Sequence, residues 1–302
     1  LAVLQAADGM TLHQMSYTGT LPWFIEEYLA DLNPERKAEV SEFFRSQLFE
    51  IRALATSADL TRLAVATGDE HIRIWSLQDG SLLQDLVHDL VTDVDQMAFS
   101  PDAQKLVVVE RGRDMGMWNV PQAKLLWHHK EVGHINGQPF SPDGKLLAAE
   151  ISSYISADAW VLLLNADYGD KIGKITGARV SSNPFSADGK HLATYWYQRA
   201  RIFLTTNMAY IQKIETGVDI ASLSYSSDGA TLLVNGGEQA WNGQDFSPAD
   251  AAPFKPTPAP VYEDPTTELR AEGFYTGLQG VLPLADGSLR AWGTLGQREY
   301  YW

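Results

Sequence analysis

Cysteine is absent from this chain of 302 residues, and basic residues are scarce. Without cysteine the chain has no disulfide, no thiolate nucleophile and no zinc–thiolate site. The absence of cysteine does not decide between an oxidising and a reducing compartment. The chain has 23 Lys and Arg against 38 Asp and Glu, which gives a formal net charge of -15. This acidic balance argues against a general role in binding nucleic acid.

Long hydrophobic runs are also missing. No stretch approaches the roughly 18 to 20 consecutive apolar residues that cross a bilayer, so we expect no membrane insertion. The amino end shows no basic region followed by an apolar run. The chain begins with Leu1 instead of methionine, which indicates a trimmed product or a segment of a longer one. That start favours an exported protein, with a cytoplasmic one still open.

A repeat runs through most of the chain. Five segments align on a shared aspartate: "TSADLTRLAVATG" at Asp59, "FSPDAQKLVVVE" at Asp102, "FSPDGKLLAAE" at Asp143, "FSADGKHLATYW" at Asp188 and "YSSDGATLLVNGG" at Asp228. Successive aspartates lie 43, 41, 45 and 40 residues apart. A fixed period of this length indicates one structural unit used repeatedly.

Each unit has the signals of short strands and tight turns. Runs of Val, Ile, Leu and aromatic residues alternate with Gly, Asp, Asn and Ser, and four strands fit the period. Asp accepts hydrogen bonds from backbone N–H groups two residues on, and Gly accepts the positive φ angle of a tight turn. We therefore interpret the repeated aspartates as turn residues, not as catalytic ones.

Twisted four-stranded sheets repeated about every 40 to 45 residues are typical of a β-propeller, which hides the sheet edges by closing them into a ring. The expected fold is therefore all-β, with four-stranded antiparallel blades. Five units lie in residues 49–255, and a last blade is expected in 256–302 after a proline-rich stretch. Residues 1–16 align with a third and fourth strand through an Asp-Gly turn and are expected to complete that blade. These segments together predict a single domain over residues 1–302 with six or seven blades.

One unit carries a more specific pattern. The segment "ATGDEHIRIW" places Thr67 and Asp69 just before Trp75, and "ADGSLRAW" repeats the aspartate and tryptophan as Asp286 and Trp292. With these residues the chain resembles the WD-repeat propellers. Their blades carry a histidine before the first strand, a Ser or Thr in the second, an aspartate in the next turn and a tryptophan in the third strand.

The resemblance is degenerate and covers roughly residues 50–302. His88 and His129 stand near the family's histidine position, but no Trp-Asp dipeptide follows and no unit has all four residues. In the family these positions brace the blade, so the resemblance implies a structural role for them here. It also implies a protein-binding role for the whole chain, and the degenerate repeats with plain "FSPDGK" turns resemble those of bacterial members of the family.

Residues 20–48 break the strand pattern and predict a helical hairpin. The second helix is expected to begin after an Asn33 cap with Pro34 at its first position. Apolar residues recur at helical spacing, and they are Phe24, Ile25, Tyr28, Leu29, Leu32, Val40, Phe43, Phe44 and Leu48. We expect this face to pack against the side or end of the ring, and the alternative is that it receives a partner.

Familiar catalytic and cofactor signatures are absent, so no cofactor and no catalytic residue is assigned. His128, His129 and His134 cluster near Glu131, but without a defined ligand spacing they favour surface or blade bracing over a metal site. "NADYGDKIG" lacks the later ligands of a calcium loop and predicts a solvated turn. No metal site is expected.

The candidate contact residues lie where second and third strands are joined, because these turns share one end of a propeller. They are His71, Glu110, Arg111, Arg113, Tyr154, Trp196, Tyr197 and Arg199. Tyr, Trp and Arg are enriched at binding hot spots, and the arginines contrast with the acidic chain. The competing interpretation is that the aromatic residues pack between blades.

Three functions remain open from the sequence. The preferred one is a noncatalytic scaffold that binds a protein or peptide with acidic or mixed-charge groups. The second is a propeller hydrolase or lyase that uses His71 and Glu110 for acid–base chemistry. The third is a structural subunit of a surface or envelope assembly, with the helical hairpin as its joint. The partner's identity and the oligomeric state are not fixed by the sequence.

Overall fold

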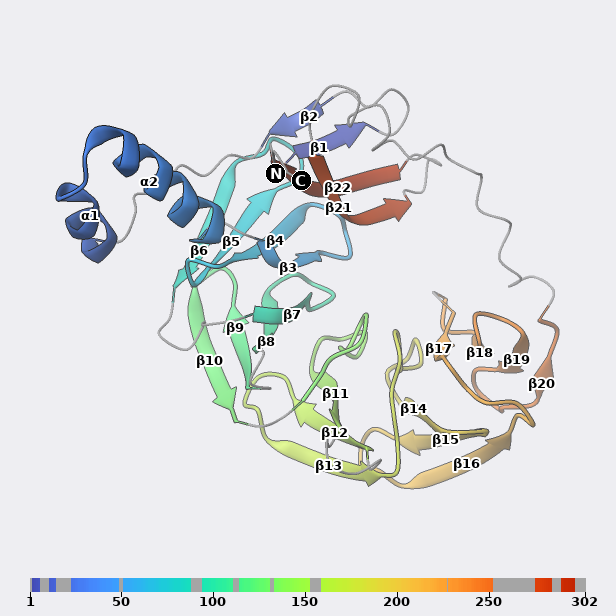
Figure 1. Cartoon of the computed structure of the whole chain (residues 1–302). Helices are drawn as coiled ribbons and strands as arrows, with labels where there is room; N and C mark the ends of the chain where they lie inside the picture. Colours follow the sequence, from blue (N-terminus) through green and yellow to red (C-terminus); the bar gives the residue numbers. More distant parts are fainter. Residues whose placement is uncertain are drawn as a thin grey trace.

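The computed structural model describes residues 2–5, 11–14, 23–48, 51–87, 94–110, 114–130, 133–152, 159–226, 228–251, 275–283 and 289–296. Within these ranges the strands form six antiparallel sheets. Figure 1 shows the sheets following one another around an arc, which is the arrangement of β-propeller blades. The fold is all-β apart from two helices, as the repeat predicts.

Five sheets follow chain order, and each represents one of the five repeats. The first contains β3 (Ile51–Thr56), β4 (Arg62–Thr67), β5 (His71–Ser76) and β6 (Leu82–Val87). The second contains β7 (Val94–Phe99), β8 (Lys105–Glu110), β9 (Met115–Asn119) and β10 (Lys124–His129). The third contains β11 (Leu146–Ser152), β12 (Ala159–Asn165) and β13 (Lys171–Thr176). The fourth contains β14 (His191–Trp196), β15 (Arg199–Leu204) and β16 (Tyr210–Glu215). The fifth contains β17 (Leu223–Tyr225), β18 (Thr231–Val234), β19 (Gln239–Asn242) and β20 (Pro248–Ala249).

The third and fourth sheets depart from the expected four strands. In place of a regular first strand, each has a segment joined to the next strand by two isolated bridges, such as Phe140 with Leu147 and Phe185 with Leu192. Pro139 and Pro184 stand directly before these phenylalanines, and their carbonyls still accept hydrogen bonds from the neighbouring strand. Proline has no N–H to donate, so the ladder is interrupted there.

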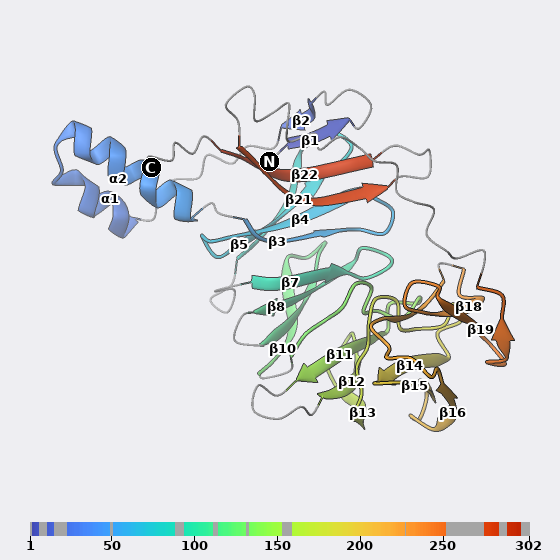
Figure 2. The same ribbon diagram turned by 45° about the vertical axis from the view of Figure 1, so that its right-hand side comes forward.

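The sixth sheet joins the two ends of the chain. Its order is β2 (Thr11–Gln14), β1 (Ala2–Gln5), β22 (Leu289–Gly296) and β21 (Tyr275–Pro283). Leu4 pairs with Ala291 and Gln5 with Arg290, so the amino-terminal strands take the outer two places in this sheet. Figures 1 and 2 both show this sheet beside β3 and β4.

The core is divided into layers between neighbouring sheets. In β8, Leu106 and Val108 pack toward the first sheet, whereas Val107 and Val109 pack toward the third. Successive side chains of a strand point to opposite faces, so a strand covered on both faces is apolar throughout. This is why "LVVVE" is a continuous apolar run: β8 lies between two sheets that cover both of its faces.

The hairpin consists of α1 (Trp23–Ala30) and α2 (Pro34–Leu48). The Asn33 side chain accepts a hydrogen bond of 2.9 Å from the Arg36 N–H, which confirms the predicted cap. The expected packing against the ring is wrong: among the described side chains, the buried cluster of the hairpin contains hairpin residues alone, and Figures 1 and 2 show the hairpin extending away from the sheets. Neither helix is long and apolar enough to cross a membrane.

Candidate partner-binding site

The five repeated aspartates have the same role in their turns. Each accepts a hydrogen bond from the serine hydroxyl two residues earlier, at 2.6 Å in four turns and 2.7 Å at Asp188. Each also accepts one from the backbone N–H two residues later, at 3.0–3.1 Å. The glycine that follows three of them, at positions 144, 189 and 229, has a φ angle of 67–69°. The turn interpretation is confirmed: the hydrogen bonds of these carboxylates stabilise the turns.

The electrostatics of these turns agree with that role. Burial opposes ionisation of Asp188, but hydrogen bonds from Ser186 and Lys190 outweigh it and lower the pKa of Asp188 to about 2. The Ser226 hydroxyl and the Ala230 N–H likewise lower the pKa of Asp228. The aspartates are therefore held ionised by the turns and are unsuited to proton transfer near neutral pH.

In the first sheet, Thr67 and Asp69 of the WD-like pattern belong to a partly buried network of polar side chains. The Thr67 hydroxyl lies 2.5 Å from an Asp69 oxygen, and Arg73, which is only 2% exposed, donates hydrogen bonds to both residues. His71 Nδ1 lies 2.8 Å from Asp85 Oδ1 on β6. The network stabilises the sheet. His71, which the sequence predicts as a contact residue, is already paired with Asp85.

The candidate contact residues lie at or beside the upper turns, which are the links between second and third strands at 68–70, 111–114, 153–158, 197–198 and 235–238. Arg111, Arg113 and Tyr154 lie outside the described residues. Trp196, Tyr197 and Arg199 come together in the fourth sheet, whereas His71 and Glu110 belong to the first and second sheets.

The upper turn of the fourth sheet presents an aromatic pair. Tyr197 is 66% exposed, and its ring meets the Trp196 ring edge to face with 5.1 Å between centroids. The Ile220 N–H donates to the Tyr197 carbonyl at 2.9 Å, and Tyr197 itself has a φ angle of 52°. Arg199 Nε lies 3.4 Å from Glu215 Oε1, an exposed ion pair on the same sheet. The Glu215 carboxylate therefore already neutralises part of the positive charge that was expected at this turn.

Glu110 is unusual among the candidates. Burial, with a further contribution from the negative charge of Asp114, raises the pKa of Glu110 to about 7. It lies at the end of β8, opposite Val94 in the strand ladder. A carboxyl group with such a pKa exists in both protonation states near neutral pH.

Sequence reasoning missed a second glutamate at the corresponding place in the third sheet. Glu150 is 7% exposed, and its carboxylate oxygens lie 3.8 Å from Arg179 Nε and 3.3 Å from the Val180 N–H. Burial raises the pKa of Glu150 despite these partners, and burial together with the Glu150 charge raises the pKa of Tyr195. The available signal was that "LVVVE" and "LLAAE" both end in glutamate.

The histidine cluster follows the bracing interpretation. His129 Nε2 lies 2.7 Å from the Gly169 carbonyl oxygen, which links the second sheet to the third. His128 Nε2 lies 3.7 Å from Asp114 Oδ2. Asp167, from the weak calcium-like segment, pairs with Lys105 Nζ at 2.7 Å. Across the described residues, no group of three or more His, Asp or Glu side chains is arranged to hold a metal ion.

Comparison with known proteins gives one informative match. No protein-family model matches the chain. Over 105 residues the chain is 29% identical to Actin-interacting protein 1 of Drosophila melanogaster, a WD-repeat protein. The match covers 33% of this chain and 17% of that protein. The likeness supports a relation to WD-repeat proteins, and it covers too little of the relative to transfer its activity or partner.

Proposed function

We propose that this chain is a noncatalytic protein-interaction scaffold that binds a protein or peptide through its upper turns. The observation that supports this most is the Trp196–Tyr197 pair, in which the exposed Tyr197 ring contacts the half-buried Trp196 ring and the Tyr197 carbonyl accepts a hydrogen bond from the following connection. Rigid aromatic side chains give large contact area at low entropy cost and dominate binding hot spots. The likeness to a protein named for its interaction with another protein agrees with this role.

The proposal extends the site over the neighbouring upper turns, with Arg111, Arg113 and Tyr154 beside His71, Glu110 and Arg199. The partner would then place acidic or mixed-charge groups against the arginines. Because Arg199 is paired with Glu215, its own share of the attraction would be reduced.

The test compares two exposed tyrosines in turns at opposite ends of the sheets. Tyr197 lies in an upper turn, whereas Tyr168, 74% exposed, lies in the turn between β12 and β13 at the other end. Proteins captured from a lysate by the wild type are identified and re-measured with Tyr197→Ser and Tyr168→Ser. We expect the partner's affinity to fall about tenfold or more with Tyr197→Ser and to stay unchanged with Tyr168→Ser.

A second variant addresses the charge. Replacing Arg111, Arg113 and Arg199 together with Glu is expected to abolish binding of the same partner with little change in melting temperature. Capture that survives both this change and Tyr197→Ser would reject the site.

The raised pKa of Glu110 favours one alternative, an enzyme with an acid–base carboxyl group near the upper turns. Turnover of a panel of ester, glycoside and lactone substrates would support it, provided that Glu110→Gln abolishes the activity. His71 fits this alternative less well, because Asp85 already engages its ring.

A further inference from the structure

The described side chains of the helical hairpin form a small core of their own. Ile25 and Leu29 are 5% and 2% exposed, and half-buried apolar side chains pack against them, namely Leu32, Val40, Phe44 and Leu48. On α2 the residues at 40, 44 and 48 are spaced by four and therefore share the face toward α1. Phe43 falls to the side of this face, so the expectation that it lies with them is corrected.

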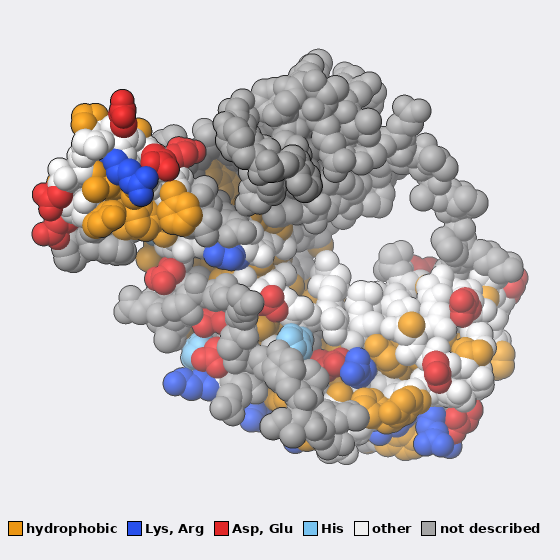
Figure 3. Space-filling model, in the orientation of Figure 1, with side chains coloured by type: hydrophobic (Ala, Val, Ile, Leu, Met, Phe, Trp, Pro, Cys, Tyr) orange, Lys and Arg blue, Asp and Glu red, His pale blue; other side chains and the backbone are white. Residues whose placement is uncertain are grey.

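Two large aromatic side chains remain outside this core. Tyr28 is 57% exposed and Phe43 is 60% exposed. Both rings meet Phe44 edge to face, with centroid distances of 6.3 Å for Tyr28 and 5.8 Å for Phe43. Tyr28, Phe43 and Phe44 thus form one surface from two helices, here called the aromatic patch. Figure 3 shows apolar side chains gathered over the hairpin on this side of the molecule.

The aromatic patch contains two exposed rings, so it differs from a single apolar side chain on a protein surface. Isolated apolar side chains are common on protein surfaces, but contiguous aromatic surfaces with a polar rim mark interaction sites. Ile25 and Leu29 are already buried by the inner side chains, whereas Tyr28 and Phe43 are each more than half exposed. An occupant from outside the chain would remove these rings from water.

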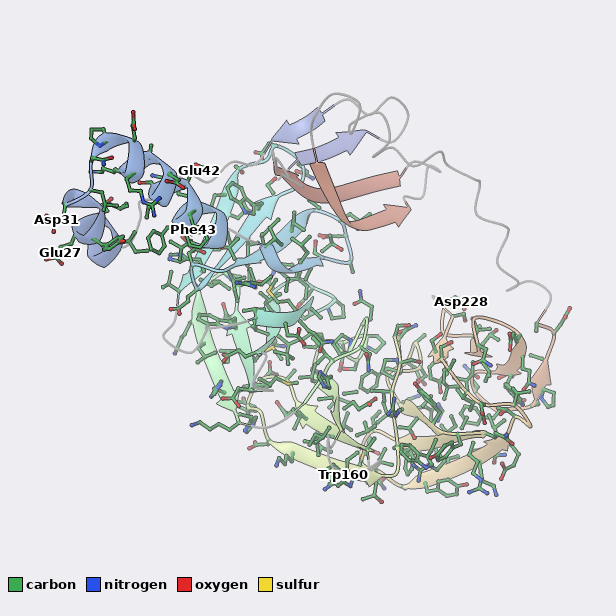
Figure 4. All side chains as sticks on the ribbon, in the orientation of Figure 1. Glu27, Asp31, Glu42, Phe43, Trp160 and Asp228 are labelled. Carbon is green, nitrogen blue, oxygen red and sulfur yellow. The ribbon has the colours of Figure 1, made fainter. Side chains whose placement is uncertain are left out.

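The hairpin that carries the patch has more acidic than basic residues, and its acidic residues are here called the rim. The two helices and their link carry six acidic residues against three basic ones, and the acidic residues are Glu26, Glu27, Asp31, Glu35, Glu39 and Glu42. Within the described residues Glu39 alone of these is in an ion pair, with Arg36 at 2.9 Å. Figure 4 shows Glu27 and Asp31 toward the α1 end and Glu42 near Phe43. In the sequence, Glu27 directly precedes Tyr28 and Glu42 directly precedes Phe43, so an acidic residue is next to each exposed ring.

We propose that the aromatic patch binds a basic amphipathic segment of a partner protein. The apolar side chains of that segment would cover Tyr28 and Phe43, and its Lys and Arg side chains would meet Glu27, Asp31 and Glu42. Charge complementarity selects this occupant, since an acidic segment, a nucleic acid or an anionic membrane would be repelled by the rim. The surface is separate from the upper turns, so it does not depend on the function proposed above.

The probe is a fluorescent helical peptide built from Leu and Lys in an amphipathic pattern, with the same pattern in Leu and Glu as its control. Binding to the full chain is measured by fluorescence anisotropy at low and moderate salt. We expect the Lys peptide to bind and the Glu peptide not to bind. The double variant Tyr28→Ser with Phe43→Ser should weaken binding about tenfold or more, with an unchanged circular dichroism spectrum.

A charge-matched pair of variants separates the rim from the overall acidity of the chain. Glu27→Lys with Asp31→Lys is expected to weaken binding at least about fivefold, because both changes lie beside the patch. Asp170→Lys with Asp219→Lys changes the net charge equally at exposed sites on the sheets and should leave binding unchanged.

Three outcomes would overturn the proposal. One is equal binding of the Lys peptide by wild type and the double serine variant, and another is equal weakening by both charge variants, which would leave only non-specific attraction. The third is binding of anionic phosphatidylglycerol vesicles, lost on the serine changes, in place of peptide binding.

Discussion

The sheets and the helical hairpin use similar aromatic side chains in opposite ways. Phe185, between the third and fourth sheets, is 1% exposed, whereas Phe43 on the hairpin is 60% exposed. The third sheet is covered on both faces by its neighbours, but the hairpin buries its small core within itself. The comparison indicates that the apolar residues of the sheets serve the fold, and that the outer rings of the hairpin are available for contact.

The largest difference is expected from truncating these two phenylalanines. Phe185→Ala removes a fully buried ring and should lower the free energy of unfolding by about 3–5 kcal/mol. Phe43→Ala removes an exposed ring and should lower it by less than about 0.5 kcal/mol. Urea unfolding followed by circular dichroism measures both. Similar losses of unfolding free energy in the two variants would contradict this contrast, because Phe43 would then be part of a core.

A smaller effect separates two glycines at the same turn position. Gly144 and Gly229 have φ angles of 68° and 67°, so alanine at either is strained by about 1–2 kcal/mol. A methyl group at Gly229 would also lie 2.5 Å from the Ala187 nitrogen in the neighbouring sheet's turn, whereas at Gly144 the nearest atom is 3.6 Å away.

Gly229→Ala should therefore destabilise the protein more than Gly144→Ala, by a further 1–3 kcal/mol or so. Thermal unfolding of the two single variants gives the comparison. Equal melting temperatures would mean that the turns of neighbouring sheets are not packed against one another.

The smallest effect concerns pH. The folded-state pKa of Asp188 is lowered from 3.8 to about 2, so its contribution to stability is present above the unfolded value and is lost as pH falls through the folded value. Since Asp188 is largely exposed, we expect less than about 1 kcal/mol from it. Asp188→Asn should flatten the loss of stability between about pH 4 and 2. Asp31→Asn on the hairpin is the control, and an equal flattening there would contradict the turn account.

Local chemistry explains what the sequence could predict. Asp143 with Gly144 identifies a turn through hydrogen bonds and a φ angle that involve near neighbours only. The Asn33 cap is similarly local. Pro139 and Pro184 were visible too, and their missing N–H groups explain why two sheets lack a regular first strand.

Packing between distant segments explains what the sequence could not predict. Glu150 meets Arg179 only because the third and fourth sheets are neighbours, and no local pattern identifies that pair. The exposure of Phe43 depends on which side of α2 faces α1. The contact role of Arg111, Arg113 and Tyr154 stays a prediction, because these residues lie outside the described part of the chain.

Native-state hydrogen exchange of the full chain tests the central contrast most directly. The account predicts that amides of α1 and α2 open locally, at lower free energy than amides of β8 and β12, and that Phe185→Ala reduces protection in the strands but not in the helices. Helix amides that are as protected as the strands, and that lose protection in parallel with them in Phe185→Ala, would contradict it.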